Sequence, residues 1–453
     1  MAEIVIDQGY DLHLAGQPDQ AVLDAPLPRR VAVRPPEFYR CKMRPVVQAG
    51  DAVKVGTPLL QDKDRPELVV VSPASGTVAE VKRGARRALL EVSVDVAGRD
   101  EFEDFGSLAP NVASRQQVRE LLLKAGLWPT LRQHPYGRIA NPDDIPKGIF
   151  VSCFESDPFL PDANVTLEGQ EEAFALGVEA LKRLTDGAVH LGVEAATRVP
   201  CRAIREVRGE GVEKHRIRGP RPASNPAVQA FFVDRVKPGE VIWYLDPQDV
   251  AAIGMLVRDG HFPTDKVITL AGTGVKESDR THYRVRRGTR ASDLLDGKLV
   301  EGELRVVSGS LLTGTKIDLA SCLGFYDSAL VVIPEGSNRR EFLGWLWPGA
   351  KRASWSRAFA SALRPESEEF EVDTNLNGGH RACIQSGYCL KVCPTDVQPL
   401  FVWKAVSYGD LEEMEQLGIT DCVSCGLCTY VCPSKIEIDD YIKRGLEELQ
   451  KEG

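Results

Sequence analysis

Seven of the eleven cysteines of this 453-residue chain lie between residues 383 and 432, and four of them have the spacing of a metal site. Residues 422–433 have the sequence CVSCGLCTYVCP, in which the cysteines follow the pattern C-x2-C-x2-C-x3-C-P. This pattern binds a cubane iron–sulfur cluster through three thiolates on one tight loop, while the fourth thiolate ligates a neighbouring cluster. We therefore expect this part of the chain to fold around its cluster ligands and to carry electrons.

A second, incomplete copy of the motif precedes the first. Residues 383–394 have the sequence CIQSGYCLKVCP, which places Ser386 where the second cysteine is expected. In the two-cluster arrangement, the last cysteine of each run joins the first cysteines of the other run. This predicts one complete site (Cys393, Cys422, Cys425 and Cys428) and one altered site (Cys383, Cys389 and Cys432 with Ser386).

Zinc and disulfides are the alternatives for these cysteines. Structural zinc usually takes two separated pairs of ligands. Three closely spaced cysteines followed by a fourth before proline, in a motif that is nearly duplicated, fit that pattern poorly. Disulfides are disfavoured because no export signal is apparent and the other cysteines are scattered (Cys41, Cys153, Cys201 and Cys322). We predict one [4Fe-4S] cluster in the complete site. The altered site could hold a serine-ligated [4Fe-4S] cluster, a [3Fe-4S] cluster or none.

Length and charge exclude other classes of protein. A chain of 453 residues is expected to form about three or four domains. The net charge of −9 disfavours nucleic-acid binding, which needs a basic face to neutralise phosphates. No apolar stretch approaches the roughly 18–20 residues that span a bilayer, so we expect no transmembrane segment. A thiol-rich metal site without an export signal points to the cytoplasm.

The chain before the cysteine motifs divides by its hydrophobic pattern. Residues 1–105 contain short strands of period two separated by glycine turns, as in VVQAGDAVKVGTPLL and VVVSPASGTVAEV, and resemble a lipoyl-like barrel-sandwich hybrid without the lysine that carries biotin or lipoate. Residues 106–262 alternate strand and helix, beginning with the amphipathic stretch RQQVRELLLKAGL, which predicts a Rossmann-like α/β domain. This domain lacks a Gly-rich nucleotide loop, so FMN is not expected there. Residues 263–337 return to strands.

Residues 338–453 are predicted to form a linker and a helical domain. The segment 338–365 combines aromatic and basic residues, including Trp345, Trp347 and Trp355, and is expected to contact a membrane surface or a partner, or to pack on the protein itself. Between the two cysteine runs, apolar residues recur at helical spacing. This favours an α-helical ferredoxin-like domain, against which a charged C-terminal helix would pack.

The order of these segments resembles that of the NqrA subunits of the Na+-translocating NADH:quinone reductases (Nqr). The stretches that carry this resemblance are GYDLHLAGQP (9–18), SPASGTVAEVKRGARRALLEV (72–92), LLLKAGLWPTLRQHPYGRI (121–139), DPQDVAAIGMLVRDGHFPTDKVITLAGTGVK (246–276), RVVSGSLLTGTK (305–316) and FLGWLWPG (342–349). The resemblance implies an α+β multidomain fold in which residues 263–337 form a β-grasp, SLBB-like domain. It also implies a peripheral subunit on the cytoplasmic side of the membrane, docked on membrane and flavin-bearing subunits with quinone nearby.

The cysteine tail departs from that family. NqrA subunits usually keep only a remnant, CTYVCPxK, and bind no iron, whereas here CTYVCPSK (428–435) lies within an intact motif. In this respect the tail is similar to the RnfC subunit of the Rnf complex, a relative that has a Gly-rich site for FMN and NADH. The region of this chain that corresponds to that site has the sequence KAGLWPTLRQHPYG, without the Gly-rich pattern. The sequence favours an Nqr-type subunit that relays electrons through at least one cluster. An Rnf-like flavin subunit and a non-redox scaffold with relic cysteines are the alternatives.

The seven histidines are not predicted to form a further site. They occur singly and in varied contexts, so each is expected to be structural: His13, His134, His190, His215, His261, His282 and His380.

Overall fold

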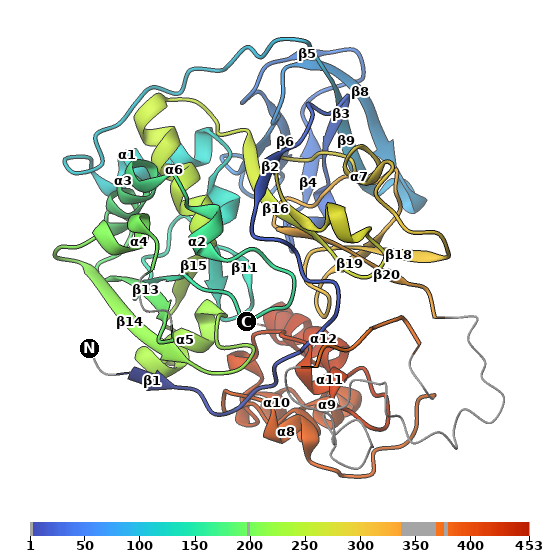
Figure 1. The fold of residues 1–453 in the computed structure, drawn as a ribbon. Coiled ribbons are helices and arrows are strands. Elements are labelled where there is room, and N and C mark those ends of the chain that lie inside the picture. Colours follow the sequence, from blue (N-terminus) through green and yellow to red (C-terminus); the bar gives the residue numbers. More distant parts are fainter. Residues whose placement is uncertain (1–2, 197–199, 337–367, 376–378, 453) are drawn as a thin grey trace.

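The computed structural model describes residues 3–196, 200–336, 368–375 and 379–452, which form four β-sheets and a C-terminal group of helices (Figure 1). This confirms the expected α+β multidomain fold. The predicted aromatic and basic segment at 338–365 lies outside the described residues. Among the described helices, none has both the length and the apolar composition needed to cross a membrane.

Two small sheets close the barrel-sandwich domain. Their inward-facing valines and leucines form one hydrophobic core, in which Val55, Leu59 and Val94 are fully buried. The alternation predicted from sequence therefore produces the two-layer packing. One sheet has the order β3 (Arg30–Val33), β9 (Leu89–Val96), β8 (Gly76–Arg83) and β5 (Ala52–Val53), and the other β4 (Met43–Pro45), β6 (Pro58–Asp62) and β7 (Val69–Val71).

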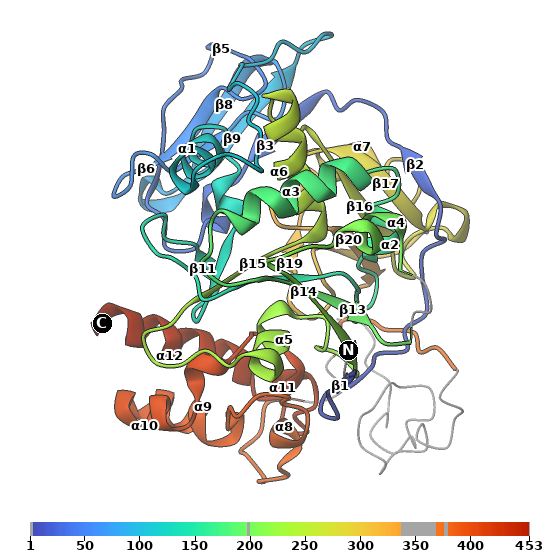
Figure 2. The ribbon, with the colours of Figure 1, turned by 90° about the vertical axis from the view of Figure 1, so that its left-hand side faces the viewer.

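The α/β domain is built on a seven-stranded sheet in which five neighbouring strands are parallel and the last two pairings are antiparallel. The strand order is β1 (Glu3–Val5), β14 (Val212–Arg218), β13 (Val189–Glu194), β12 (Ile149–Ser152), β15 (Ile242–Leu245), β10 (Arg132–His134) and β11 (Arg138–Ile139). Figure 2 shows α3 (Glu171–Lys182) and α6 (Pro247–Asp259) on one side of this sheet and α5 (Pro226–Val233) on the other. The other helices of this domain are α1 (Arg115–Lys124), α2 (Ala163–Thr166) and α4 (Arg202–Glu206).

Local sequence explains where these helices begin. Ser114 and Gln117 form a capping box at the start of α1, because each side chain bonds the backbone N–H of the other residue. Asp246 caps α6 through the backbone N–H of Gln248, and Gly260 ends that helix in the left-handed conformation. The helix over residues 115–124 confirms the amphipathic pattern predicted there.

The third unit contains a six-stranded sheet in the order β19 (Thr315–Ile317), β18 (Leu304–Ser308), β20 (Ala329–Pro334), β16 (Asp265–Ala271), β17 (Thr281–Arg286) and β2 (Val22–Asp24), with α7 (Ala291–Leu295). Its edge strand β2 comes from the N-terminal segment, as does β1 of the seven-stranded sheet. Residues 3–5 and 22–24, which sequence patterning assigns to the first domain, therefore join two other sheets. Strands of three residues cannot be stable alone, so they add to edges that distant segments provide.

The C-terminal helices form a separate hydrophobic core around Val402, Met414, Ile419 and Ile442, all fully buried. A Cβ on Gly445 would lie 2.6 Å from Val406, so the glycine allows the last helix to approach its neighbour closely. These helices confirm the predicted helical domain and comprise α8 (Tyr388–Lys391), α9 (Pro399–Tyr408), α10 (Leu411–Gln416), α11 (Leu427–Tyr430) and α12 (Ile438–Glu452).

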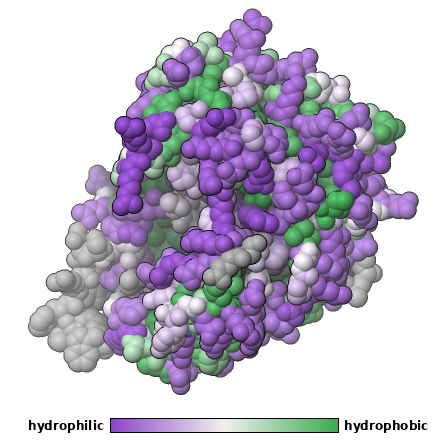
Figure 3. All heavy atoms as spheres, turned by 180° about the vertical axis from the view of Figure 1, so that it is seen from behind, coloured by the Kyte–Doolittle hydropathy of each residue, from purple (hydrophilic) through white to green (hydrophobic). Residues whose placement is uncertain are grey.

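The helical domain lies against the α5 side of the α/β domain (Figure 2). Arg235 links the two by ion pairs to Asp396 at 2.5 Å and to Asp421 at 2.6 Å. Leu312 of the third unit packs with Leu427 and other apolar residues of the helical domain. Three units of the chain therefore meet around the cysteine loops. Seen from behind the view of Figure 1, the surface is mostly hydrophilic, with hydrophobic side chains scattered among the hydrophilic ones (Figure 3).

Candidate metal centres

The two cysteine runs fold into loops of the same backbone shape. Residues 383–389 lead into α8, and residues 422–428 lead into α11. The third and fifth residues of each loop have positive φ, with values of 55° and 70° in the first loop and 51° and 76° in the second (Gln385, Gly387, Ser424 and Gly426). A non-glycine residue with positive φ is uncommon, and its presence at the same position in both loops indicates a specific turn. Ser386 therefore occupies the place in its loop that Cys425 occupies in the other.

Backbone N–H groups point at the sulfurs in both loops. The N–H of Gln385 donates to Cys383 Sγ and the N–H of Ser424 donates to Cys422 Sγ, each at 3.4 Å. Amide hydrogen bonds to sulfur are one of the means by which a protein stabilises a cluster and sets its potential. The loops thus provide these donors as well as the thiols.

The complete set of cysteines surrounds one hollow in the helical domain. It is lined by Cys393, Cys422, Cys425 and Cys428, and it has empty space of about 380 Å³, part of it open to solvent. Cys393 comes from the end of the first run, and the other three come from the second loop. The structure therefore brings together the four residues that the crossed two-cluster arrangement predicts as ligands.

The altered set surrounds a second hollow in the same domain. It is lined by Cys383, Cys389 and Cys432 together with Ser386, and its empty space is about 300 Å³, again partly open. Cys432 reaches this hollow from the end of the second run. The side chain of Ile384 beside it is 69% exposed, so this hollow lies near the surface.

Burial disfavours bare thiolates in both hollows. Desolvation raises the pKa of Cys425 to about 11, and it raises the pKa of Cys422 and Cys428 further above the ordinary thiol value. In the second hollow, desolvation raises the pKa of Cys389 to about 11. Reactive cysteines have lowered pKa values, so these thiols are not arranged as nucleophiles. They become good ligands when a metal supplies the positive charge that ionises them.

The donor set fits an iron–sulfur group. All eleven cysteines lie in the described residues and are free thiols. The first hollow offers four thiols beside Thr395 and Asp439. The second offers three thiols and the hydroxyls of Ser386 and Ser434. No histidine lines either hollow. Sulfur ligation by four cysteines is the usual set for a cubane cluster.

A buried arginine beside the complete site was not found from sequence. Arg221, whose side chain is 2% exposed, follows β14 in the α/β domain and forms an ion pair with Asp157. Its positive charge opposes the burial that raises the pKa of Cys425. The Arg221 Nη1 atom has no hydrogen-bond partner among the described residues. Only the docking of the helical domain places this charge near a cysteine, so the sequence offered no signal for it.

Four family models match this chain. They are the NqrA N-terminal barrel-sandwich hybrid domain (residues 4–97), the NqrA second alpha/beta domain (113–262), the NQRA C-terminal domain (267–318) and a 4Fe-4S dicluster domain (382–436). The last match spans all the predicted cysteine ligands and supports an iron–sulfur cluster. The match to the third unit agrees with its expected SLBB character.

Curated relatives match over the whole length. The A subunit of the Na(+)-translocating NADH-quinone reductase of Rhodopirellula baltica is 34% identical, with 99% of this chain and 98% of the relative covered. The same subunit from Histophilus somni is 34% identical and covered to 100%, and that of Pasteurella multocida is 33% identical and also covered to 100%. Among solved structures, a chain of an NAD+-reducing [NiFe]-hydrogenase aligns with 50% of this chain, and the alignment covers 48% of the hydrogenase chain. The sequence identity is 14% and the TM-score is 0.35.

Proposed function

Because this chain belongs to the NqrA family, the A subunits of the Na(+)-translocating NADH-quinone reductases, we propose that it serves in a complex of that type as a peripheral electron-transfer subunit. One observation carries the electron-transfer part of the proposal: two sets of cysteines line two hollows in one helical domain. A [4Fe-4S] cluster supplies one-electron transfer when it is bound.

The residues of the complete site have distinct roles in this proposal. Cys393, Cys422, Cys425 and Cys428 would hold the cluster. The N–H of Ser424 would stabilise the charge on a ligand sulfur, as its bond to Cys422 Sγ suggests. The apolar residues Val397, Leu427 and Ile442 line the same hollow and would limit the access of water.

The altered site would hold a second cluster through Cys383, Cys389 and Cys432. Ser386 lines the hollow at the position of the missing cysteine. Its hydroxyl would either ligate the fourth iron of a [4Fe-4S] cluster or stay unbound beside a [3Fe-4S] cluster. Because this hollow lies near the surface, it would face a redox partner outside the chain.

Family membership supports the remaining parts of the proposal. We infer that the chain docks on the membrane subunits of the complex from the cytoplasmic side and exchanges electrons with a flavin-bearing subunit, with quinone nearby. NADH would be oxidised elsewhere in the complex, since no Gly-rich nucleotide loop occurs in the α/β domain. Isolation of the intact complex, with its subunits and cofactors counted, tests this arrangement. A complex that assembles without this chain would contradict it.

Analysis of iron and labile sulfide in the anaerobically purified chain tests the electron-transfer function. We expect at least four irons per chain, about the number in one cubane, with matching sulfide and an EPR signal after reduction. Absence of iron and sulfide would leave a scaffold subunit. Flavin bound to the isolated chain, with two interacting clusters, would instead favour Rnf-like wiring.

Replacing Ser386 by cysteine tests the altered site. We expect the iron content of the S386C variant to rise to about eight per chain, because the new thiolate completes a second four-cysteine set. The matched control is S407C, which adds a cysteine on the exposed side of α9 and should leave the iron content unchanged. If S386C and the wild type contain the same number of irons, below eight, the second hollow does not accept a four-iron cluster.

A further inference from the structure

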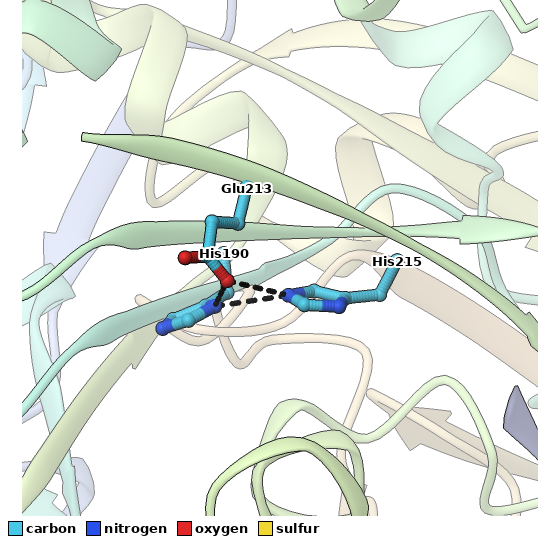
Figure 4. Close-up of side chains that lie close together, drawn as sticks. All are labelled: His190, Glu213 and His215. Carbon is cyan, nitrogen blue, oxygen red and sulfur yellow. Dashed lines mark hydrogen bonds and ion pairs between the residues drawn. The ribbon is translucent and has the colours of Figure 1, made fainter. Parts of the chain in front are cut away.

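Two histidines and a glutamate converge on neighbouring strands of the α/β domain, outside the cysteine sites. His190 lies on β13, and Glu213 and His215 lie on β14. In the strand register, His190 is opposite Glu213, and His215 is two residues further along β14. Because side chains alternate between the faces of a strand, Glu213 and His215 point to the same face. Figure 4 shows the three side chains directed at one another.

The three facing atoms form a compact triangle. His190 Nδ1 is 2.9 Å from His215 Nε2 and 3.5 Å from Glu213 Oε2, and the last side, from His215 Nε2 to Glu213 Oε2, is 3.7 Å. Zinc binds histidine nitrogen and carboxylate oxygen at about 2.0–2.2 Å, so two ligand atoms of a tetrahedral site are about 3.3–3.5 Å apart. The two sides that end at Glu213 are close to these values. The side between the histidines, at 2.9 Å, is a hydrogen-bond distance, so the two rings must move apart by about 0.4 Å to hold an ion.

The imidazoles are held in place and uncharged. The ring of His190 stacks on Phe150 with ring centroids 4.3 Å apart, and its side chain is only 10% exposed. Burial, followed by the charge of His215, lowers the pKa of His190 to about 4, and burial also lowers the pKa of His215. Neutral imidazole is the form that binds metal ions. Glu213, whose side chain is 59% exposed, adds a negative charge at the solvent side.

We propose that His190 Nδ1, His215 Nε2 and the Glu213 carboxylate bind one divalent transition-metal ion of the zinc class, with water as the fourth ligand. Three protein ligands leave one tetrahedral position free, and the exposure of Glu213 opens that position to solvent. The ion would tie β13 to β14 next to the edge strand β1. This inference does not depend on the iron–sulfur clusters.

Zinc binding by the full chain tests this site. The chain is purified anaerobically, freed of loosely bound metal and titrated with Zn²⁺, and zinc X-ray absorption is recorded on the zinc-loaded protein. Zinc on the cysteines would give zinc–sulfur distances of about 2.3 Å, whereas this site gives nitrogen and oxygen distances of about 2.0–2.2 Å. The measurement therefore separates the two kinds of site whether or not the clusters are present.

We expect the wild type to bind one zinc more than the double variant H190Q/H215Q, with a nitrogen and oxygen shell. E213Q changes an exposed carboxylate and is expected to keep the circular dichroism spectrum of the wild type. Its affinity for this zinc should fall at least about 100-fold, because replacing even residues that only orient metal ligands lowers metal affinity about 10–100-fold. H13Q, at an exposed histidine elsewhere, is the control and should bind as the wild type does. Equal binding by the wild type and E213Q, or a spectrum with sulfur ligands only, would overturn the proposal and leave a hydrogen-bonded pair of histidines.

Discussion

Replacing Cys422 and Cys428 together by alanine is expected to remove about four irons per chain and the corresponding labile sulfide. Both side chains line the complete hollow, and only two thiols would remain there (Cys393 and Cys425). The loss should extend to local structure, because α8 and α11 have only four residues each and cannot be stable in isolation. Iron analysis, EPR of the reduced protein and hydrogen exchange of residues 379–452 measure these effects.

The matched control for this variant replaces Cys41 and Cys201, which are also partly buried but lie in other domains. That double alanine variant should keep its iron. An unchanged iron content in the Cys422 and Cys428 variant would show that the second loop does not ligate a cluster. A similar loss in the control would mean that iron content follows general stability and not these ligands.

Replacing Arg221 by methionine is expected to lower the free energy of unfolding by about 3–5 kcal/mol, the usual cost of breaking a buried ion pair by removing one partner. Methionine fills much of the same space but leaves Asp157 without its positive partner, and Glu155 would lose a favourable charge as well. Urea denaturation followed by circular dichroism measures the change. Because the charge of Arg221 also acts on Cys425, the reduction potential of a cluster in the complete site should become more negative.

Arg235 provides the control for Arg221, since it forms ion pairs with Asp396 and Asp421 across the same domain contact. Its side chain is 48% exposed, so R235Q should cost less than about 1 kcal/mol. Equal destabilisation by R221M and R235Q would show that burial of Arg221 is unimportant. An unchanged potential in R221M would show that its charge does not act on the cluster site.

Sequence patterns predicted much of the fold because the relevant forces are local. The amphipathic stretch 115–124 became α1 with its own capping box, and the alternating stretch 69–81 became β7 and most of β8, one in each sheet of the barrel-sandwich domain. The helical spacing between the cysteine runs became α9 and α10. In each case, the period of apolar residues and the capping side chains lie within a few residues of one another.

The same patterns missed contacts between distant segments. Residues 3–5 and 22–24 join two sheets whose other strands come from residues 132–334, and nothing in three residues specifies that partner. Glu213 and His215 have the spacing that puts both on one face of a strand, a signal that sequence patterning could have used. Their approach to His190, however, depends on the register of two strands, and His215 is 25 positions from His190 in the sequence.

The cysteine spacing by itself determined which thiols line which hollow, because a tight loop can present only nearby sulfurs to one site and the residue before proline is held apart. It also identified Ser386 as the residue at the position where the second cysteine is expected. Tertiary structure alone decided what surrounds those thiols, including the buried charge of Arg221, and it alone brought His190 to Glu213 and His215. The physical reason is that burial and through-space charge depend on how domains dock, which local spacing does not encode.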